Sequence, residues 1–441
     1  MTLARFAPLS IVREVPHHRS NKFYGQPTTS YTVLPVLDDN STSTLRTSGF
    51  IDTYTILPQH LYTTTIKISA TMLCILPDEL LLITGVTGHV GFAVLTHALK
   101  AGHTVRCAVR SEAKAAFIRS RPQIRALDLP RARLNFTIVP DITTDGAYDD
   151  AIRGVSAVIH VASPLATADS VPRDLHQEYF IQPAVRGTLG MLEAAKRAGT
   201  VRRVVITSSV VALTSVDHLE GRERREAVQP TERTGFKPEP YESEFAAYAA
   251  SKVAALKGAE AWIAREQPRF EVIHLHPSFV IGRNDIATTA SEAMKGTNAV
   301  ILATLRGKKM GCSYPGATVH VDDVARAHVQ ALLPTVPGNK GYILSTKSRW
   351  NDAKLIAKRS FPEAVERKLI VSSGSVGTVN IDFDASASEE VFGFKLQSFE
   401  EQVRSVVGHF VELRLRRPAL PTVSSSSMAV NQHLRPEVVA A

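Results

Sequence analysis

Residues 79–91 read ELLLITGVTGHVG, an apolar run followed by a turn rich in glycine. The run at 79–84 has the length of a buried strand in a parallel sheet. After the turn, apolar residues recur with helical spacing from Val90 to Leu99, and Gly102 ends the pattern. A strand, a glycine-rich turn and a helix in this order are typical of a βαβ unit whose turn binds the diphosphate of a dinucleotide. This stretch therefore predicts both an α/β fold and a cofactor.

Each glycine of the turn has its own task in this interpretation. Gly85 allows the tight bend, Gly88 lets the backbone approach the diphosphate, and Gly91 lets the helix pack closely on the strand. The free N–H groups at the start of the helix then face the diphosphate. A tight turn without a ligand is the alternative. The residues that we expect to bind the cofactor here are Gly85, Thr87, Gly88, His89, Val90 and Gly91.

Strands and helices alternate along the chain after this unit, a pattern typical of a parallel sheet with helices on both faces. We expect strands at 79–84, 103–110, 134–139, 155–162, 203–208 and 270–281. We expect further helices at 111–119, at 174–198 with an interruption at Pro183, and at 245–266. The predicted fold is a doubly wound parallel sheet of the Rossmann type with a smaller C-terminal lobe for the substrate. That lobe would comprise the charged loop at 217–244 and the segments after about residue 277.

The two ends of the chain differ in character from its centre. Residues 1–71 are rich in Ser, Thr and Pro without a sustained period, so we expect a disordered or targeting leader. Three arginines and one acid among its first twenty residues weakly resemble a mitochondrial transit peptide. We expect a cytoplasmic protein, with a mitochondrial location or a true start at Met72 as alternatives. Residues 72–416 form the predicted catalytic unit, and 417–441 a disordered tail.

The composition argues against several classes of protein. The chain has 441 residues, 44% hydrophobic and 21% charged, which is a globular composition. Its net charge of +9 is spread along the chain, which argues against a nucleic-acid partner. Without a run of 18 apolar residues, we expect no membrane span. The cysteines at 74, 107 and 312 form no CxxC pair, so we expect neither disulfides nor a cysteine zinc site.

The end of the second predicted strand bears on the choice between NAD and NADP. An acid there binds the ribose 2′-hydroxyl of NAD, whereas a cation binds the 2′-phosphate of NADP. The sequence has Arg110 at this point and Lys114 one helical turn later. Glu112 between them is ordinary for the first turn of a helix, where an acid complements the dipole. We therefore predict NADPH as the cofactor, with a solvated pair of surface cations as the alternative.

A second group of residues has the chemistry of a proton donor. Tyr248 and Lys252 are four apart on a predicted helix and share one face, and Ser209 ends a predicted strand. A lysine ammonium beside a phenol would favour the phenolate and lower its pKa from the ordinary value of about 10. The phenol would then donate its proton to a carbonyl oxygen while a hydride reaches the carbon, and the serine hydroxyl would hold the same oxygen.

Together these motifs resemble those of the extended short-chain dehydrogenases/reductases. The resemblance rests on TGxxGxxG at 84–91, Arg110, TSS at 207–209 and YxxSK at 248–252. Four stretches make it narrower: HVASP at 160–164, PAVRGT at 183–188, PSFV at 277–280 and HVDDVA at 320–325. These are similar to the dihydroflavonol-reductase-like branch, which includes fungal ketone and aldehyde reductases. The resemblance covers about residues 79–412 and leaves the first 71 residues without a counterpart.

The resemblance implies roles for particular residues. Ser209, Tyr248 and Lys252 would be catalytic, and Lys252 would also bond the nicotinamide ribose. Further implied cofactor contacts are Asp141, Ile142, Val161, Ala162, Ser163, Pro277, Ser278 and Val280. Two residues depart from the branch: His276 stands where Asn or Arg is more common, and Arg283 where Pro is common. Both positions belong to the expected surroundings of the substrate and therefore concern its identity.

The predicted reaction is a reversible hydride transfer between NADPH and a small-molecule ketone or aldehyde, with Tyr248 as proton donor. One alternative is an NAD-dependent sugar-nucleotide epimerase or dehydratase, against which Arg110 argues. Another is a non-catalytic NADP-binding regulator, against which the intact Ser, Tyr and Lys argue.

Histidines outside these motifs receive plainer interpretations. His160 either lines the nicotinamide pocket or is a packed, hydrogen-bonded side chain. His320 and His328 frame VDDVARA, where we expect Asp323 to cap a helix and no metal to bind.

Overall fold

The structure is a computed structural model, and it describes residues 10–13, 31–34, 79–165, 171–223 and 226–416. Within the predicted leader it describes only the antiparallel strands β1 (Ser10–Arg13) and β2 (Tyr31–Leu34). The remaining predictions for the leader, and those for Cys74 and the tail, concern residues outside the described ranges.

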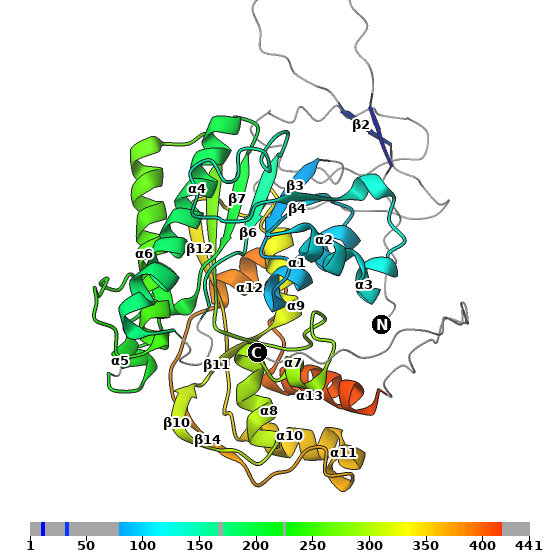
Figure 1. The fold of residues 1–441 in the computed structure, drawn as a ribbon, viewed down its shortest axis with the longest axis vertical. Helices are drawn as coiled ribbons and strands as arrows, with labels where there is room; N and C mark the ends of the chain where they lie inside the picture. The colour runs from blue at the N-terminus through cyan, green and yellow to red at the C-terminus, as the bar shows by residue number, and fades with distance from the viewer. Residues whose placement is uncertain (1–9, 14–30, 35–78, 166–170, 224–225, 417–441) are drawn as a thin grey trace, which may run out of the picture.

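A seven-stranded parallel sheet forms the larger part of the molecule (Figure 1). Its strands, in spatial order, are β12 (Lys340–Leu344), β8 (Glu271–Pro277), β7 (Arg203–Thr207), β6 (Ala157–His160), β3 (Leu80–Thr84), β4 (Thr104–Val109) and β5 (Leu134–Ile138). Every neighbouring pair is parallel. This confirms the predicted doubly wound sheet. The predicted strand at 270–281 is divided at Ser278, because its last part, β9 (Phe279–Ile281), pairs with another sheet.

The helices vary in length from one turn to six. They are α1 (His89–Lys100), α2 (Glu112–Arg119), α3 (Pro122–Arg125), α4 (Gln182–Ala198), α5 (Val216–Leu219), α6 (Glu244–Glu266), α7 (Ala290–Ala293), α8 (Ala299–Leu305), α9 (Val321–Gln330), α10 (Asp352–Ser360), α11 (Pro362–Glu366), α12 (Ser386–Phe392) and α13 (Phe399–Leu415). A single π-helical turn, Gln177–Ile181, precedes α4 and accounts for the predicted interruption near Pro183.

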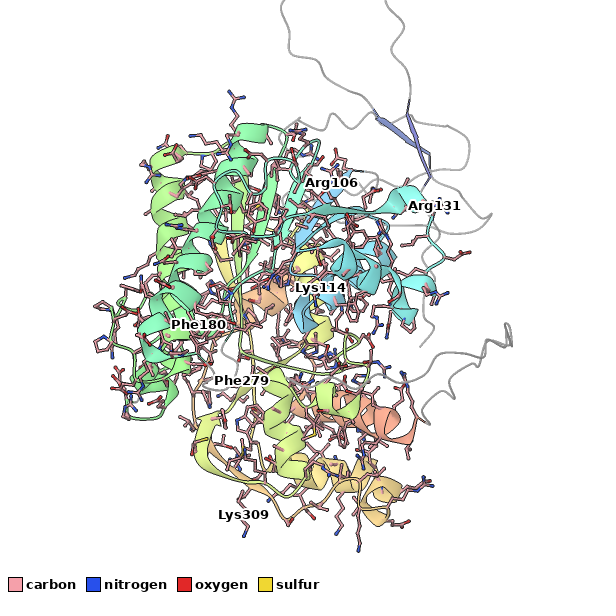
Figure 2. All side chains as sticks on the ribbon, viewed as in Figure 1. Arg106, Lys114, Arg131, Phe180, Phe279 and Lys309 are labelled. Carbon is pink, nitrogen blue, oxygen red and sulfur yellow. The ribbon has the colours of Figure 1, made fainter. Side chains whose placement is uncertain are left out.

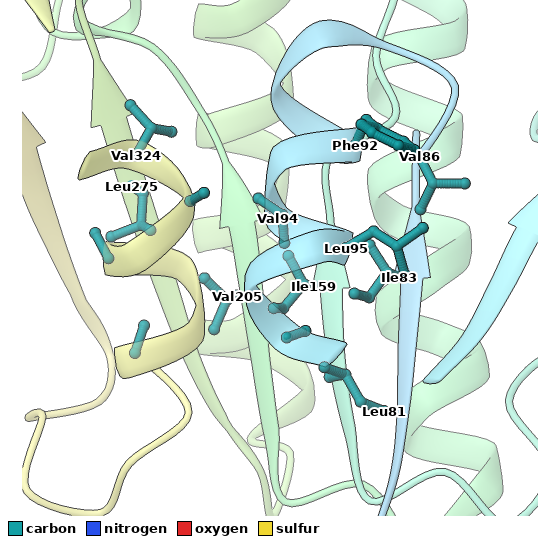
Figure 3. Close-up of a cluster of buried hydrophobic side chains, with 14 of the residues drawn as sticks. Leu81, Ile83, Val86, Phe92, Val94, Leu95, Ile159, Val205, Leu275 and Val324 are labelled. Atoms are coloured by element: carbon teal, nitrogen blue, oxygen red, sulfur yellow. The ribbon is translucent and has the colours of Figure 1, made fainter. Parts of the chain in front are cut away.

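Alternate residues of the strands enter two separate cores. Leu81 and Ile83 of β3 pack on one face of the sheet against α1, α9 and α12, as Figure 3 shows for α1 and part of this cluster. Leu82, between them, packs on the other face against α4 and α6. Because both faces are covered by helices, β3 is apolar from Leu80 to Ile83, as the run at 79–84 indicated.

A smaller lobe lies beyond the carboxyl ends of the large sheet (Figure 1). It contains β9, β11 (Ala317–His320) and β13 (Thr346–Lys347) in one sheet, and β10 (Lys309–Pro315) with β14 (Ser375–Val379) in another. Its core surrounds Trp350 and includes apolar residues of α8, α10 and α13. The chain after Pro277 is shared between the two units, because α9, β12 and α12 return to the large sheet.

The segment at 217–244, expected to be a long surface loop, is partly packed. It begins in α5, and Val228 is fully buried. Val228 forms an isolated parallel bridge with Phe383, donating its N–H to Asp382 and accepting from Asp384. The many charged neighbours of Val228 concealed this anchoring in the sequence. In the described part of the chain, no helix has the length and apolar character required to cross a bilayer.

The order of the strands reverses beside β3. β4 and β5 lie on one side of it and β6, β7 and β8 on the other, so the chain crosses from β3 to β4 and from β6 to β7 in opposite directions. In open α/β sheets, ligands bind in the crevice at this point, outside the carboxyl ends of the strands. The glycine-rich turn follows β3, and the HVASP stretch begins in β6.

Candidate active site

The glycine-rich turn has the shape that its predicted tasks require. Gly85 has φ of +75°, a conformation that disfavours side chains. A Cβ atom on Gly91 would lie 2.1 Å from the Gly85 carbonyl oxygen, so α1 packs on the turn more closely than any side chain permits. Gly88 donates its N–H to the Gly85 carbonyl (3.0 Å) and is itself exposed. The backbone at Gly88 is therefore open to a ligand.

The start of α1 offers free donors to an anion. Its N-cap is Gly88, which has no capping side chain, and the first turn contains no acid. The first N–H groups of a helix lack partners within the helix and carry its positive dipole end. This arrangement and the shape of the turn fit the diphosphate of a dinucleotide. Thr87 is half-buried, and Val90 packs against the core below the turn.

His89 contacts the smaller lobe. Its Nε2 lies 3.0 Å from the carbonyl oxygen of Arg283, so this ring nitrogen carries the hydrogen. Burial lowers the pKa of His89 to about 4, which keeps the imidazole neutral near pH 7. The side chain of His89 thus joins the turn to the lobe, and its expected contact with the cofactor remains a prediction.

Arg110 and Lys114 lie at the end of β4 and in α2, and both are exposed (Figure 2 labels Lys114). Ser111 between them is the N-cap of α2 and accepts a hydrogen bond from the Lys114 N–H. Among the described residues, neither cation has an acidic partner within 4.0 Å. Two unpaired cations beside the crevice fit a phosphate group.

The residues of the Asp141–Ile142 turn are held by their own neighbours. The Asp141 carboxylate accepts from the N–H and the hydroxyl of Thr143, both at 2.8 Å, and these bonds lower its pKa. The Ile142 side chain lies over Gly187 of α4, where a Cβ atom would come within 2.9 Å of it. The turn is thus firmly placed next to the crevice, while its contact with a cofactor remains a prediction.

A threonine joins the two segments at the reversal of strand order. Thr84 Oγ1 accepts hydrogen bonds from Val161 N–H and Ala162 N–H, each at 3.1 Å. It also lies 3.0 Å from His160 Nδ1. A Cβ atom on Gly85 would lie 2.7 Å from the Ala162 nitrogen, so the two segments touch. His160 is therefore a buried, hydrogen-bonded side chain, and its pKa falls to about 3 because of burial.

The structure brings together the three residues expected to be catalytic. Ser209 follows β7, and Tyr248 and Lys252 are successive turns of α6. The Ser209 hydroxyl lies close enough to the Tyr248 phenol to lower its pKa. Lys252 Nζ lies 5.9 Å from the centre of the Tyr248 ring and donates to the Thr207 carbonyl at 3.3 Å. Their meeting at the carboxyl end of β7 places them beside the crevice.

The acidities in this group differ from the sequence-based expectation. Burial raises the pKa of Tyr248, and the nearby Ser209 hydroxyl opposes that change. The Lys252 ammonium is directed to the Thr207 carbonyl and does not offset the effect of burial on the tyrosine. Burial lowers the pKa of Lys252 to about 8. The expected net lowering of the tyrosine pKa is therefore wrong in this state of the protein.

Residues 81–343 match the NAD dependent epimerase/dehydratase family. The chain belongs to this family. It is 43% identical over 345 residues to ketoreductase CTB6 of Cercospora nicotianae, covering 76% of this chain and 96% of the relative. It is 35% identical to the NAD-dependent epimerase/dehydratase ALT6 of Alternaria alternata, covering 74% and 96%.

Solved structures of reductases share the fold. Yeast methylglyoxal/isovaleraldehyde reductase Gre2, determined with NADPH, matches with a TM-score of 0.65 at 21% identity, covering 76% of this chain and 99% of that one. Together with the fungal ketoreductases, these neighbours confirm the predicted placement among the extended short-chain dehydrogenases/reductases and in their reductase-like branch.

The family's PSFV stretch links the large sheet to the lobe. The Pro277 carbonyl accepts a weak hydrogen bond from Ser209 Oγ at 3.5 Å. Ser278 is bonded to the Leu344 carbonyl through its N–H (3.0 Å) and its hydroxyl (3.4 Å). Val280 is buried in β9. Figure 2 shows Phe279 where the large sheet meets the lobe.

The two departures from the family pattern have structural partners. His276 is fully buried and lies 3.3 Å from the Ser209 carbonyl through Nδ1, so it supports the backbone of the serine. Arg283 pairs with Asp285 and Glu412, both at 2.6 Å. These ion pairs account for Arg283, whereas Nε2 of His276 is buried without a partner among the described residues.

The residue expected to cap α9 is wrong, and a histidine that supports Thr207 was missed in the sequence. His320, not Asp323, is the N-cap of α9, with its ring accepting from the Asp322 N–H. Asp323 instead accepts from the N–H and the side-chain amide of Gln397. His328 lies 2.6 Å from the hydroxyl of Thr207, whose carbonyl holds Lys252. The position of Thr207 in the TSS stretch was the available signal for that support.

Proposed function

We propose that the chain is an NADPH-dependent reductase that transfers hydride to a ketone or aldehyde and oxidises the alcohol in reverse. The meeting of Ser209, Tyr248 and Lys252 beside the glycine-rich turn carries the proposal. The names of relatives such as ketoreductase CTB6 support carbonyl chemistry for this site. When bound, the reduced nicotinamide supplies the hydride.

Tyr248 is the proton donor in this proposal. Because burial raises its pKa, the phenol is protonated near neutral pH and is ready to give a proton to the carbonyl oxygen as charge develops there. Ser209 Oγ, which lies beside the phenol, is placed to donate a hydrogen bond to the same oxygen and to stabilise its charge.

Lys252 supports the phenolate that remains after proton transfer. Its ammonium, 5.9 Å from the centre of the tyrosine ring, stabilises the negative charge in a site from which water is largely excluded. The amine carries that charge only below a pH of about 8. The Thr207 carbonyl receives only one of the three hydrogens of the Lys252 ammonium. In the proposed complex, Lys252 therefore also donates a hydrogen bond to the nicotinamide ribose.

Arg110 and Lys114 would distinguish NADPH from NADH. Both are exposed and unpaired at the end of β4, where a 2′-phosphate on the adenosine ribose would gain charge-assisted hydrogen bonds. The sugar-nucleotide epimerases that share the family keep their NAD bound, and an arginine here does not favour that cofactor.

The proposal is tested by following NADPH oxidation across aromatic, aliphatic and polyketide-like carbonyls. We expect turnover with at least one ketone or aldehyde, a marked preference over NADH, and protein that is purified without nicotinamide. Retained NAD together with interconversion of a sugar nucleotide would replace the reductase by an epimerase. NADPH binding without turnover of any carbonyl would favour a regulator.

A further inference from the structure

A small cavity adjoins Lys252 between the large sheet and helices α4 and α6. Its volume is about 20 Å3, and among its lining residues are His160, Thr188, Thr207, His274 and Lys252. A cavity of about 10–15 Å3 on this measure already holds one water molecule if polar partners surround it. The polar lining here meets that condition.

Two of the groups at the cavity are hydrogen-bond donors. Thr84 Oγ1 accepts from two backbone N–H groups, so its single hydrogen is donated to His160 Nδ1. Neutral His160 therefore carries its own hydrogen on Nε2. Lys252 has three hydrogens, of which the Thr207 carbonyl receives one. A water molecule between these groups must accept hydrogen bonds and needs an acceptor for its own hydrogens.

His274 differs from His160 and His276 in its surroundings. His160 is bonded to Thr84, and His276 is bonded to the Ser209 carbonyl through Nδ1, while its Nε2 has no partner among the described residues. His276, however, does not line the cavity. His274 is 6% exposed, and its Nε2 has no partner among the described residues. Burial lowers its pKa to about 4, so the ring is neutral and keeps one acceptor nitrogen. A buried polar side chain without a protein partner requires an explanation, and a bound water is the usual one.

We propose that this cavity holds a water molecule that accepts a hydrogen bond from the Lys252 ammonium and donates one to His274, so that His274 keeps Lys252 charged. His274 is thus a positioning residue that acts through the lysine. The importance of this arrangement for catalysis rests on the proposed function; the hydrogen bonding itself does not.

The other charged and titratable groups around His274 do not replace this contact. Glu260 of α6 faces it, but that carboxylate is paired with Arg233 at 2.6 Å. The ring of His276 is 6.3 Å away, is bonded to the Ser209 carbonyl through Nδ1, and does not line the cavity. His160 presents a hydrogen to the cavity and cannot accept from the water in its neutral form. Of the two histidine rings that line the cavity, His274 remains as the acceptor.

The test measures the titration of Lys252 directly. In the cofactor-free protein, 15N-lysine NMR spectra follow the Nζ signal of Lys252, assigned by its loss in Lys252→Arg. A hydrogen-bonded water favours the ammonium, so His274→Leu should lower the pKa of Lys252 by about one unit. His274→Gln keeps a hydrogen-bond acceptor, so the pKa of Lys252 in that variant should stay close to its value in the unaltered protein.

His103→Leu is the matched control. His103 is also buried with an unpartnered ring nitrogen, but it precedes β4 and does not line the cavity. The His103→Leu variant should leave the pKa of Lys252 unchanged. If His274→Leu does not fold, the ring 15N shifts of His274 in the unaltered protein replace it, since an acceptor nitrogen bonded to water differs in shift from a free one.

An unchanged Lys252 titration in folded His274→Leu, or a free acceptor nitrogen in His274, would overturn the proposal. Once a carbonyl substrate is known, the pH above which kcat/KM falls should be about one unit lower in His274→Leu than in the unaltered protein. If the NMR shift occurs but no carbonyl is reduced, the hydrogen bond stands and the proposed function fails. The two ideas therefore fail separately.

Discussion

Residues 80–109, which include the glycine-rich turn, and the chain after Pro277 are organised in different ways. In the first, β3, the turn, α1 and β4 follow one another within 80–109 and pack on one another in that order. In the second, the chain passes from β9 in the lobe to α9 and β12 on the large sheet and back again. Local patterns predict the first region because neighbours in sequence are neighbours in space. In the second region, partners are chosen by contacts between distant segments.

The candidate active site takes Ser209, Tyr248 and Lys252 from β7 and α6, which lie between these two regions in the sequence. Tyr248→Phe tests its chemistry most strongly. The substitution keeps the ring and removes the hydroxyl, so carbonyl reduction should fall by at least about a hundredfold while NADPH affinity and melting temperature change little. Steady-state kinetics and thermal unfolding measure both. Tyr241→Phe is the control, because Tyr241 is also buried and its hydroxyl has no partner among the described residues. A near-normal rate in Tyr248→Phe would assign the proton to another group.

A substitution at Gly91 tests most directly the packing of residues 80–109 around the glycine-rich turn. An alanine there would place Cβ 2.1 Å from the Gly85 carbonyl, so the turn must move and NADPH affinity should be lost together with several degrees of melting temperature. Fluorescence titration and thermal unfolding measure the two effects. Gly190→Ala in α4, where a Cβ has open space, should instead be neutral or gain up to about 1 kcal/mol. Equal behaviour of the two variants would mean that the close packing at Gly91 is unimportant.

Arg110→Asp tests whether the protein prefers NADPH to NADH because of a contact with the 2′-phosphate. A charge-assisted hydrogen bond contributes about 1.5–3 kcal/mol, so KM for NADPH should rise roughly tenfold to a hundredfold. KM for NADH should change little. Arg125→Asp, on the exposed surface of α3, serves as a control for the general change of charge. Equal use of NADPH and NADH by the unaltered protein would contradict the assignment.

The pH dependence follows from the burial of Lys252. Its pKa is lowered to about 8, and for a base this means that the charged form is lost as the pH rises through that value. We expect kcat/KM for NADPH to fall about tenfold per unit above it, because the free enzyme is then without the ammonium. In Lys252→Arg the guanidinium stays charged, so this fall should vanish even if the rate is lower. A profile that is flat to pH 10 would show that the charge is not needed.

The smallest effect is expected in the region organised by distant contacts. Asp323→Ala removes two hydrogen bonds to Gln397 and leaves that backbone N–H without its partner, which should cost about 1–3 kcal/mol. His320→Ala, which removes the actual cap of α9, should cost about 1 kcal/mol. Urea unfolding gives both values. A larger effect at His320 than at Asp323 would reverse our view of which residue anchors this segment.

Spacing along the chain determined the elements and the nearness of the functional groups. Three glycines between a strand and a helix require a tight turn, and residues four apart on a helix share a face, so Tyr248 and Lys252 had to lie together. Arg110 and Lys114 likewise follow β4 by their positions alone. These inferences use only distances within one or two elements.

Only the tertiary structure decided what each of these groups contacts. Thr84 meets His160 from 76 positions away, His328 meets Thr207 from 121, and His89 meets Arg283 from 194. The direction of the Lys252 ammonium and its lowered pKa depend on the same packing, because burial and hydrogen bonding set the cost of a charge. A sequence pattern carries no record of such neighbours, since they come together only when separate strands join one sheet.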